Sequence, residues 1–242
     1  MRQSRLTWAM AIGLMASGAA HGQLTGTRLP GSSAAMVGFT GIYDEGPLTA
    51  RPSDEALEAG RNVAYCMVRR RRATVVRYLT LASVPDRKPV LTALQESMTT
   101  CLGGIKGARE MRFGETTLQG ALAEALLNLG PVPALAAVEP SKTAVPTWLS
   151  SDTNQRVVQE MSICLAERYP LESLSFVRSN AGSTEESRTF AALAPNMGPC
   201  LVRGASLKTN RGGMRLAIAT ALYHRAEAAQ LGQTATTIGE GK

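Results

Sequence analysis

Four cysteines, spaced in two nearly equal intervals, constrain this chain more than any other feature. Cys66 and Cys101 are 35 residues apart, and Cys164 and Cys200 are 36 apart. Similar residues recur at an offset of 98 around the first cysteine of each pair, 99 around the second, and 96 farther on. The matches include Val63 with Met161, Met67 with Leu165, Leu91 with Phe190, Leu94 with Leu193, Met98 with Met197, and 121–126 with 217–222.

Ordered apolar matches between paired cysteines indicate a tandem duplication of one ancestral unit. The alternative is two unrelated helical stretches that share an apolar rhythm, since helical patterns resemble one another.

The apolar spacing inside each stretch is helical. Leu91, Leu94, Met98 and Leu102 fall on one helix face, and strict alternation of strand length is hard to find. Pro170 favours a break in the first helix of the second stretch, because proline fits the first turn of a new helix. Ser183 followed by Glu186 predicts the N-terminal cap of the middle helix in that stretch. We therefore predict an all-α fold of two tandem, sequence-related small units of about three helices each, with one disulfide in each unit.

Prolines at positions 131, 133, 140 and 146 separate the two units, because such a density blocks a long helix. The predicted organisation is a signal peptide at 1–22, a flexible N-terminal arm at 23–50, the first unit at 51–129, a Pro/Ala-rich linker at 130–148, the second unit at 149–230 and a flexible tail at 231–242.

The N-terminal segment has the layout of a secretory signal peptide. Arg2 and Arg5 precede an apolar run that ends in small residues, with cleavage expected after Gly22 or after Ala19. An uncleaved anchor helix is the alternative, although the run is short and interrupted by glycine and serine. Cleavage removes both arginines and lowers the formal net charge from +7 to +5. We expect a periplasmic or secreted protein with no transmembrane span, in a compartment where cysteines pair.

Four cysteines allow three pairings. Cys66–Cys101 and Cys164–Cys200 are favoured, because an ancestral unit with two cysteines bonds only within itself. A metal site made of all four thiolates is the alternative, but structural zinc sites use ligand spacings of about two to four residues. We expect no metal and no other cofactor.

The chain offers few groups for catalysis. His224 is the one histidine of the mature chain if cleavage follows Gly22, and it is expected at the surface of a helix end. No nucleophile-elbow or phosphate-loop motif accompanies it, and Gly103, Gly104 and Gly107 indicate helix ends. The candidate acid–base carboxylates are expected on exposed faces, and none is assigned as catalytic: Glu96, Glu115, Glu124, Glu160, Glu167 and Glu172.

Arg69, Arg70, Arg71 and Arg72, with Arg77, form the densest charge feature. One interpretation is a patch for an anionic partner such as lipid headgroups, an acidic glycan or an acidic protein. The favoured interpretation is a solvated helix face whose aliphatic stems cover apolar neighbours.

An arginine and a glycine recur together after each second cysteine, as Arg112 with Gly114 and as Arg211 with Gly213. We expect the glycine at the start of the third helix, where a side chain would clash. The arginine is expected to pair with a carboxylate or a carbonyl oxygen.

These features predict an exported helical repeat protein that is not an enzyme and that binds or scaffolds in the cell envelope. Its expected partner is an anionic envelope component or a protein, and not nucleic acid, because the chain has four Phe, five Tyr and two Trp and an export signal. The alternatives are a periplasmic hydrolase that uses unidentified acidic residues and a carrier of a small apolar ligand.

Overall fold

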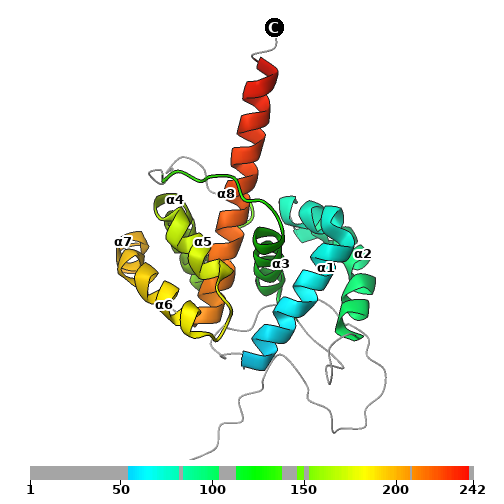
Figure 1. Cartoon of the computed structure of the whole chain (residues 1–242), viewed down its shortest axis with the longest axis horizontal. Coiled ribbons are helices and arrows are strands. Elements are labelled where there is room, and N and C mark those ends of the chain that lie inside the picture. The colour runs from blue at the N-terminus through cyan, green and yellow to red at the C-terminus, as the bar shows by residue number, and fades with distance from the viewer. Residues whose placement is uncertain are drawn as a thin grey trace, which may run out of the picture.

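A computed structural model of the chain describes residues 54–81, 84–103, 113–137, 146–149, 153–207 and 209–239. The expected signal peptide and N-terminal arm lie outside these residues. The described segments contain helices and connections but no β-strand, so the predicted all-α fold is confirmed (Figure 1).

The described residues of the first half form three helices, and those of the second half have the same order with two of the helices broken. The first half comprises α1 (Asp54–Thr80), α2 (Val84–Gly103) and α3 (Glu115–Leu129). The second half comprises α4 (Thr153–Arg168), α5 (Pro170–Arg178), α6 (Thr184–Leu193), the 3-10 turn η1 (Ala194–Asn196), α7 (Met197–Cys200) and α8 (Arg211–Gly239). Helix α8 thus continues to Gly239, into the range 231–242 that was expected to be a flexible tail.

The two halves also break their first helix at matching positions. Arg71 interrupts α1 with φ −139° and ψ 42°. Tyr169, 98 residues later, lies between α4 and α5 with φ −131° and ψ 54°. Pro170 explains the second break, because proline lacks an N–H and suits the first turn of α5. No proline lies next to Arg71, so the same backbone shape occurs there without that cause.

Helices α3 and α8 lie side by side at the centre, with α1 and α2 on one side and α4 to α7 on the other (Figure 1). They approach closely where Gly120 meets Leu216, two positions that correspond at the offset of 96. A Cβ atom on Gly120 would lie 2.5 Å from the Leu216 Cβ and 2.8 Å from its carbonyl oxygen. This contact therefore depends on the absence of a side chain at position 120.

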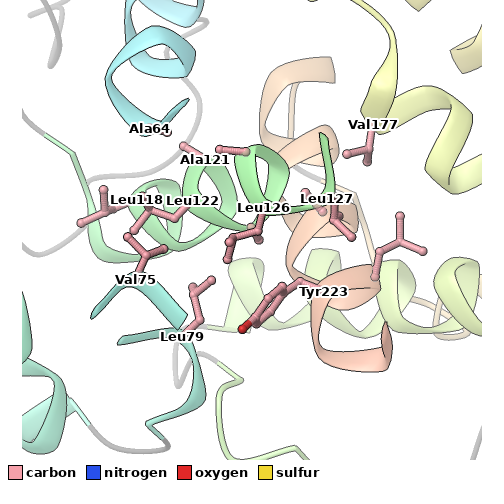
Figure 2. Packing of buried hydrophobic residues seen from close by; sticks show 14 of the residues in the cluster. Ala64, Val75, Leu79, Leu118, Ala121, Leu122, Leu126, Leu127, Val177 and Tyr223 are labelled. Carbon is pink, nitrogen blue, oxygen red and sulfur yellow. The ribbon is translucent and has the colours of Figure 1, made fainter. Parts of the chain in front are cut away.

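Both halves contribute to one continuous apolar core around these two helices (Figure 2). Leu118 and Leu122 of α3 are fully buried, as is Leu222 of α8. Large side chains from the outer helices also lie in this core and are fully buried: Tyr78, Leu94, Met98, Phe176 and Leu193.

Each half carries one disulfide, and both predicted pairings are confirmed. Cys66–Cys101 joins α1 to α2, and Cys164–Cys200 joins α4 to α7. Closing a loop of this length removes unfolded-state entropy worth about 4 kcal/mol in the chain-entropy model. Each bond also holds its middle helix in place, although that helix contributes less to the core than α3 or α8.

The start of α6 confirms a predicted helix cap. The Ser183 hydroxyl accepts a hydrogen bond from the Glu186 N–H, and the Glu186 carboxylate accepts one from the Gly182 N–H at 2.9 Å. Such reciprocal bonding satisfies N–H groups that the helix itself leaves unpaired. It also fixes Glu186 beside the centre of the molecule.

Replacing Gly120 with alanine tests the central contact. The Gly120→Ala variant should lose about 1–3 kcal/mol of unfolding free energy through overpacking, despite the better helix propensity of alanine. Urea unfolding measures this loss. The control is Gly103→Ala at the end of α2, where an added Cβ meets nothing within 4 Å. Equal stability of the two variants would contradict the role assigned to the contact.

Candidate functional site

Two groups of polar residues stand out in the described part of the chain. The first is a buried ionic cluster of Arg61, Glu124, Glu186 and Arg215 between the two halves. The second is an exposed basic face on α1, made of Arg69, Arg70, Arg71, Arg72 and Arg77.

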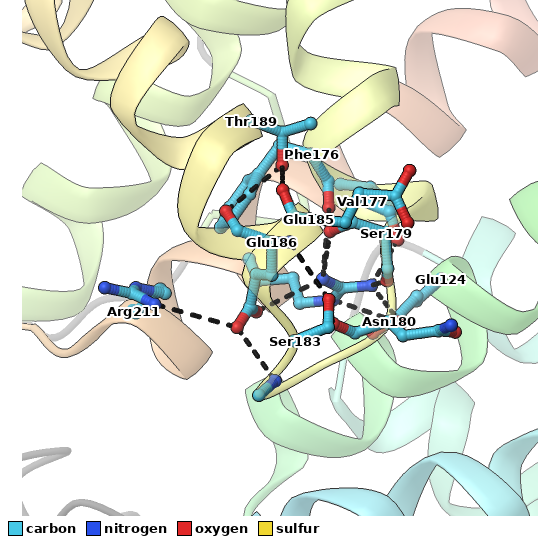
Figure 3. A network of polar contacts seen from close by, with 12 residues as sticks. Glu124, Phe176, Val177, Ser179, Asn180, Ser183, Glu185, Glu186, Thr189 and Arg211 are labelled. Carbon is cyan, nitrogen blue, oxygen red and sulfur yellow. Dashed lines mark hydrogen bonds and ion pairs between the residues drawn. The ribbon is translucent and has the colours of Figure 1, made fainter.

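Arg215 of α8 is the centre of the ionic cluster, and it pairs with Glu124 and Glu186. Both of these carboxylates are labelled in Figure 3. The Arg215 side chain is 3% exposed, and its Nε and Nη2 atoms donate to Glu124 Oε1 at 3.1 and 3.0 Å. Its Nη1 atom lies 3.2 Å from Glu186 Oε1. The guanidinium also donates to the carbonyl oxygens of Phe176, Val177 and Ser179 at the end of α5. Arg215 therefore pairs with two carboxylates and also satisfies carbonyl groups of a helix C-terminus.

Glu124 receives a second arginine from the first half. The Nε atom of Arg61 lies 2.8 Å from the same Oε1 atom, while Oε2 is buried without a hydrogen-bond partner in the described structure. Arg61 also donates toward the Ser179 carbonyl at 3.5 Å. Burial raises the pKa of the neighbouring Tyr65, against the opposing effect of its hydrogen bond with Arg61. The cluster thus ties α1 and α3 to α5 and α8 and has the contacts of a structural junction.

The prediction that Glu124 lies on an exposed helix face is wrong, because its side chain is 1% exposed. Glu124 lies in a run of α3, from Leu118 to Leu127, in which every residue is buried. A helix that is apolar on nearly every face is typical of a protein centre. That pattern was the available sequence signal, and Glu124 interrupts it.

The other candidate carboxylates of α3, α4 and α5 have different surroundings. Glu115 Oε1 lies 2.5 Å from Arg87 Nη1. Glu160 Oε1 forms a surface ion pair with Arg156 Nε at 2.8 Å. Glu172 is exposed in the first turn of α5. The backbone carbonyl of Glu167 accepts a hydrogen bond from Arg225.

Two ion pairs occupy matching places in the halves with their charges exchanged. Arg87 of α2 pairs with Glu115 of α3, and Glu186 of α6 lies 3.9 Å from Arg211 of α8. Arg87 corresponds to Glu186 at the offset of 99, and Glu115 corresponds to Arg211 at 96. Each pair links the start of a middle helix to the start of a third helix.

The recurring arginine–glycine pairs are only partly matched in space. Arg211 does pair with a carboxylate, and a Cβ on Gly213 would lie 2.6 Å from Thr209 Oγ1, as expected. However, Gly114 precedes α3, whereas Gly213 lies inside α8, because the halves correspond here at 96 and not at 99. Arg112, Gly104 and Gly107 lie outside the described residues, and Gly103 ends α2 as expected.

The expectation that His224 is a surface residue is wrong. His224 lies within α8, its ring stacks on Trp148 at 4.7 Å between centroids, and its side chain is 17% exposed. Burial of the imidazole lowers the pKa of His224 from 6.5 to about 4. His224 is therefore neutral at pH 7, and its stacking on Trp148 attaches the linker segment to α8.

The basic face lies where α1 breaks. All five arginines are exposed, and none forms an ion pair with a carboxylate of the described chain. Arg70 and Arg71 line an open hollow of about 210 Å³ whose other lining residues come from α2: Glu96, Ser97 and Thr100. Exposure fits a solvated helix face, while the hollow provides a place for a ligand.

No helix in the described segments is long and apolar enough to cross a membrane. The same segments contain no group of three or more His, Cys, Asp or Glu side chains placed to hold a metal ion. Compared with family models, with curated proteins and with solved structures, the chain gives no significant match.

Loss of the Glu124 charge should destabilise the fold strongly. Glu124→Gln leaves Arg215 buried without its nearest carboxylate, which costs about 3–5 kcal/mol when a buried pair is broken. Urea unfolding checks this, with Glu160→Gln as control, since a surface i,i+4 pair contributes about 0.3–0.5 kcal/mol. A Glu124→Gln loss as small as that of the control would show that the cluster does not hold the halves together.

The stability contribution of His224 should depend on pH. Its pKa is about 4 in the folded state and about 6.5 unfolded, so the unfolded chain binds the proton first. Stability from this residue is thus present above pH 6.5 and is lost as the pH falls toward 4, by up to about 3 kcal/mol.

The measurement is the unfolding free energy of the wild type minus that of His224→Gln, followed from pH 7 to pH 4.5. This difference should shrink with acid. Glu227, whose pKa is raised by burial, lies 3.9 Å from His224 Nδ1, so Glu227→Gln in both proteins removes its own titration from the comparison. A difference that stays constant with pH would contradict the assignment of a buried neutral imidazole.

Proposed function

We propose that this chain is an exported, non-enzymatic binding protein of the cell envelope that holds an anionic component on the basic face of α1. The observation that carries the proposal is the group of five exposed arginines that no described carboxylate neutralises. Arginine groups of this kind attract anionic surfaces and form paired hydrogen bonds with phosphate and carboxylate. Two disulfides are compatible with the oxidising compartment that export implies.

We further propose that the two halves arose by duplication and then diverged in role. The matching helix starts, the shared break and the charge-exchanged ion pairs support this history. The second half has Glu167, Arg168, Tyr169 and Pro170 at the sequence positions that correspond to Arg69, Arg70, Arg71 and Arg72. The first half then carries the binding face, while the second half supports it through α8 and the ionic cluster.

The hydrolase and carrier alternatives have less support. Within the described segments, the buried carboxylates Glu124 and Glu186 are both held by Arg215 and are not free for acid–base work. The hollow lined by Val158, Leu216 and Ala217 has about 20 Å³, close to the space of a single water.

Removing charge from the basic face should weaken binding to anionic membranes. In a vesicle co-sedimentation assay at low salt, Arg69→Gln/Arg72→Gln should reduce binding to phosphatidylglycerol vesicles by about 30-fold, since each of the two basic residues contributes about 1 kcal/mol near such a surface. Binding of the wild type should fall as salt screens the charges.

The matched control is Arg188→Gln/Arg203→Gln, which removes the same charge from exposed positions of the second half. Equal loss of binding in both double variants would mean that net charge alone matters. That result, or binding unaffected by either, would overturn the assignment of the basic face.

A further inference from the structure

We propose that the hollow between α1 and α2 binds a compact zwitterion in which a phosphate and a primary amine lie a few bonds apart, with the phosphate on Arg70 and Arg71 and the ammonium on Glu96. This inference deepens the proposed function and rests on it, because it places one head group within the basic face.

Positively and negatively charged side chains line this hollow, and the described structure contains no ion pair between them. Arg70 and Arg71 come from α1, and Glu96 comes from α2, yet within the described structure neither guanidinium forms an ion pair with that carboxylate. A purely anionic ligand would satisfy the two arginines but would bring its charge close to Glu96. A ligand with an ammonium group satisfies all three side chains.

Size and donor geometry narrow the ligand further. A volume of about 210 Å³ is below the roughly 300–1,000 Å³ of pockets for drug-sized molecules, so a head group fits better than an extended molecule. Two adjacent guanidinium groups match the several oxygens of a phosphate, which accepts paired N–H bonds from each. The Thr100 hydroxyl donates to the Glu96 carbonyl at 2.9 Å, so its oxygen can act only as an acceptor, as an ammonium donor requires.

This arrangement belongs to the first half only. The matching positions of the second half are Arg168, Tyr169, Pro195, Asn196 and Pro199, which offer one cation and no carboxylate. The prolines also replace the helical turn of α2 that carries Glu96 and Thr100 with the 3-10 turn η1 and the short α7. The second half therefore provides an internal comparison.

The test is isothermal titration of the full exported chain, with its disulfides intact, against phosphoethanolamine, ethyl phosphate and ethanolamine. Phosphoethanolamine should bind about 10-fold more tightly than either fragment, the size of one charge-assisted contact. Glu96→Gln should remove that advantage and leave ethyl phosphate binding unchanged or stronger, while Arg70→Gln should weaken both phosphates. The control Glu160→Gln should change neither.

Vesicles distinguish a lipid head group from a free molecule. Retention on phosphatidylethanolamine vesicles but not on phosphatidylcholine vesicles identifies the lipid, because a quaternary amine cannot donate a hydrogen bond. Binding of free phosphoethanolamine without vesicle retention identifies the free zwitterion.

The inference falls if ethyl phosphate binds as tightly as phosphoethanolamine and Glu96→Gln strengthens both. In that case Glu96 only competes for the arginines, and the proposed anion-binding function stands without the zwitterion. If neither phosphate nor phosphatidylglycerol vesicles bind, the proposed function falls as well.

Discussion

The close approach of α3 and α8 is the constraint on which the rest of the structure depends. The two helices touch where a glycine faces a leucine backbone, and both halves pack their apolar side chains around that contact. Since each half is small, neither buries a large core by itself. The shared centre supplies what each half lacks, and the disulfides hold the outer helices against it.

The ionic cluster gives this apolar junction a fixed register. Arg215 reaches the Glu124 carboxylate and the end of α5 only when α8 lies at one height against α3. Burying such charges costs desolvation free energy, so the cluster adds less stability than its number of contacts suggests. Its main effect is to select one packing of α3 against α8, because a shifted packing of the two helices would leave buried charges without partners.

The sequence was informative where a structural feature is local or repeats. Helical spacing predicted the all-α fold, the paired cysteines predicted both disulfides, and Ser183 with Glu186 predicted a helix cap. Features made by distant segments were not predictable in this way. Glu124 and Arg215 are 91 residues apart, and the Trp148 ring that stacks on His224 comes from the linker.

The candidate site was predicted only in part. The arginine run was visible in the sequence, and its exposure follows from charge alone. The hollow was not visible, because it needs Glu96 from another helix beside the break at Arg71, where no proline marks the change of direction. The proposed binding of a zwitterion depends on this placement of one carboxylate and two arginines around the same hollow.

The central claim is that both halves form one cooperative unit built on α3 and α8. Native-state hydrogen exchange of the full chain in increasing denaturant tests it most directly. The account predicts that the buried amides of these two helices exchange last and with the same free energy of opening. Exchange of one half at low denaturant, while the other half stays protected, would contradict it.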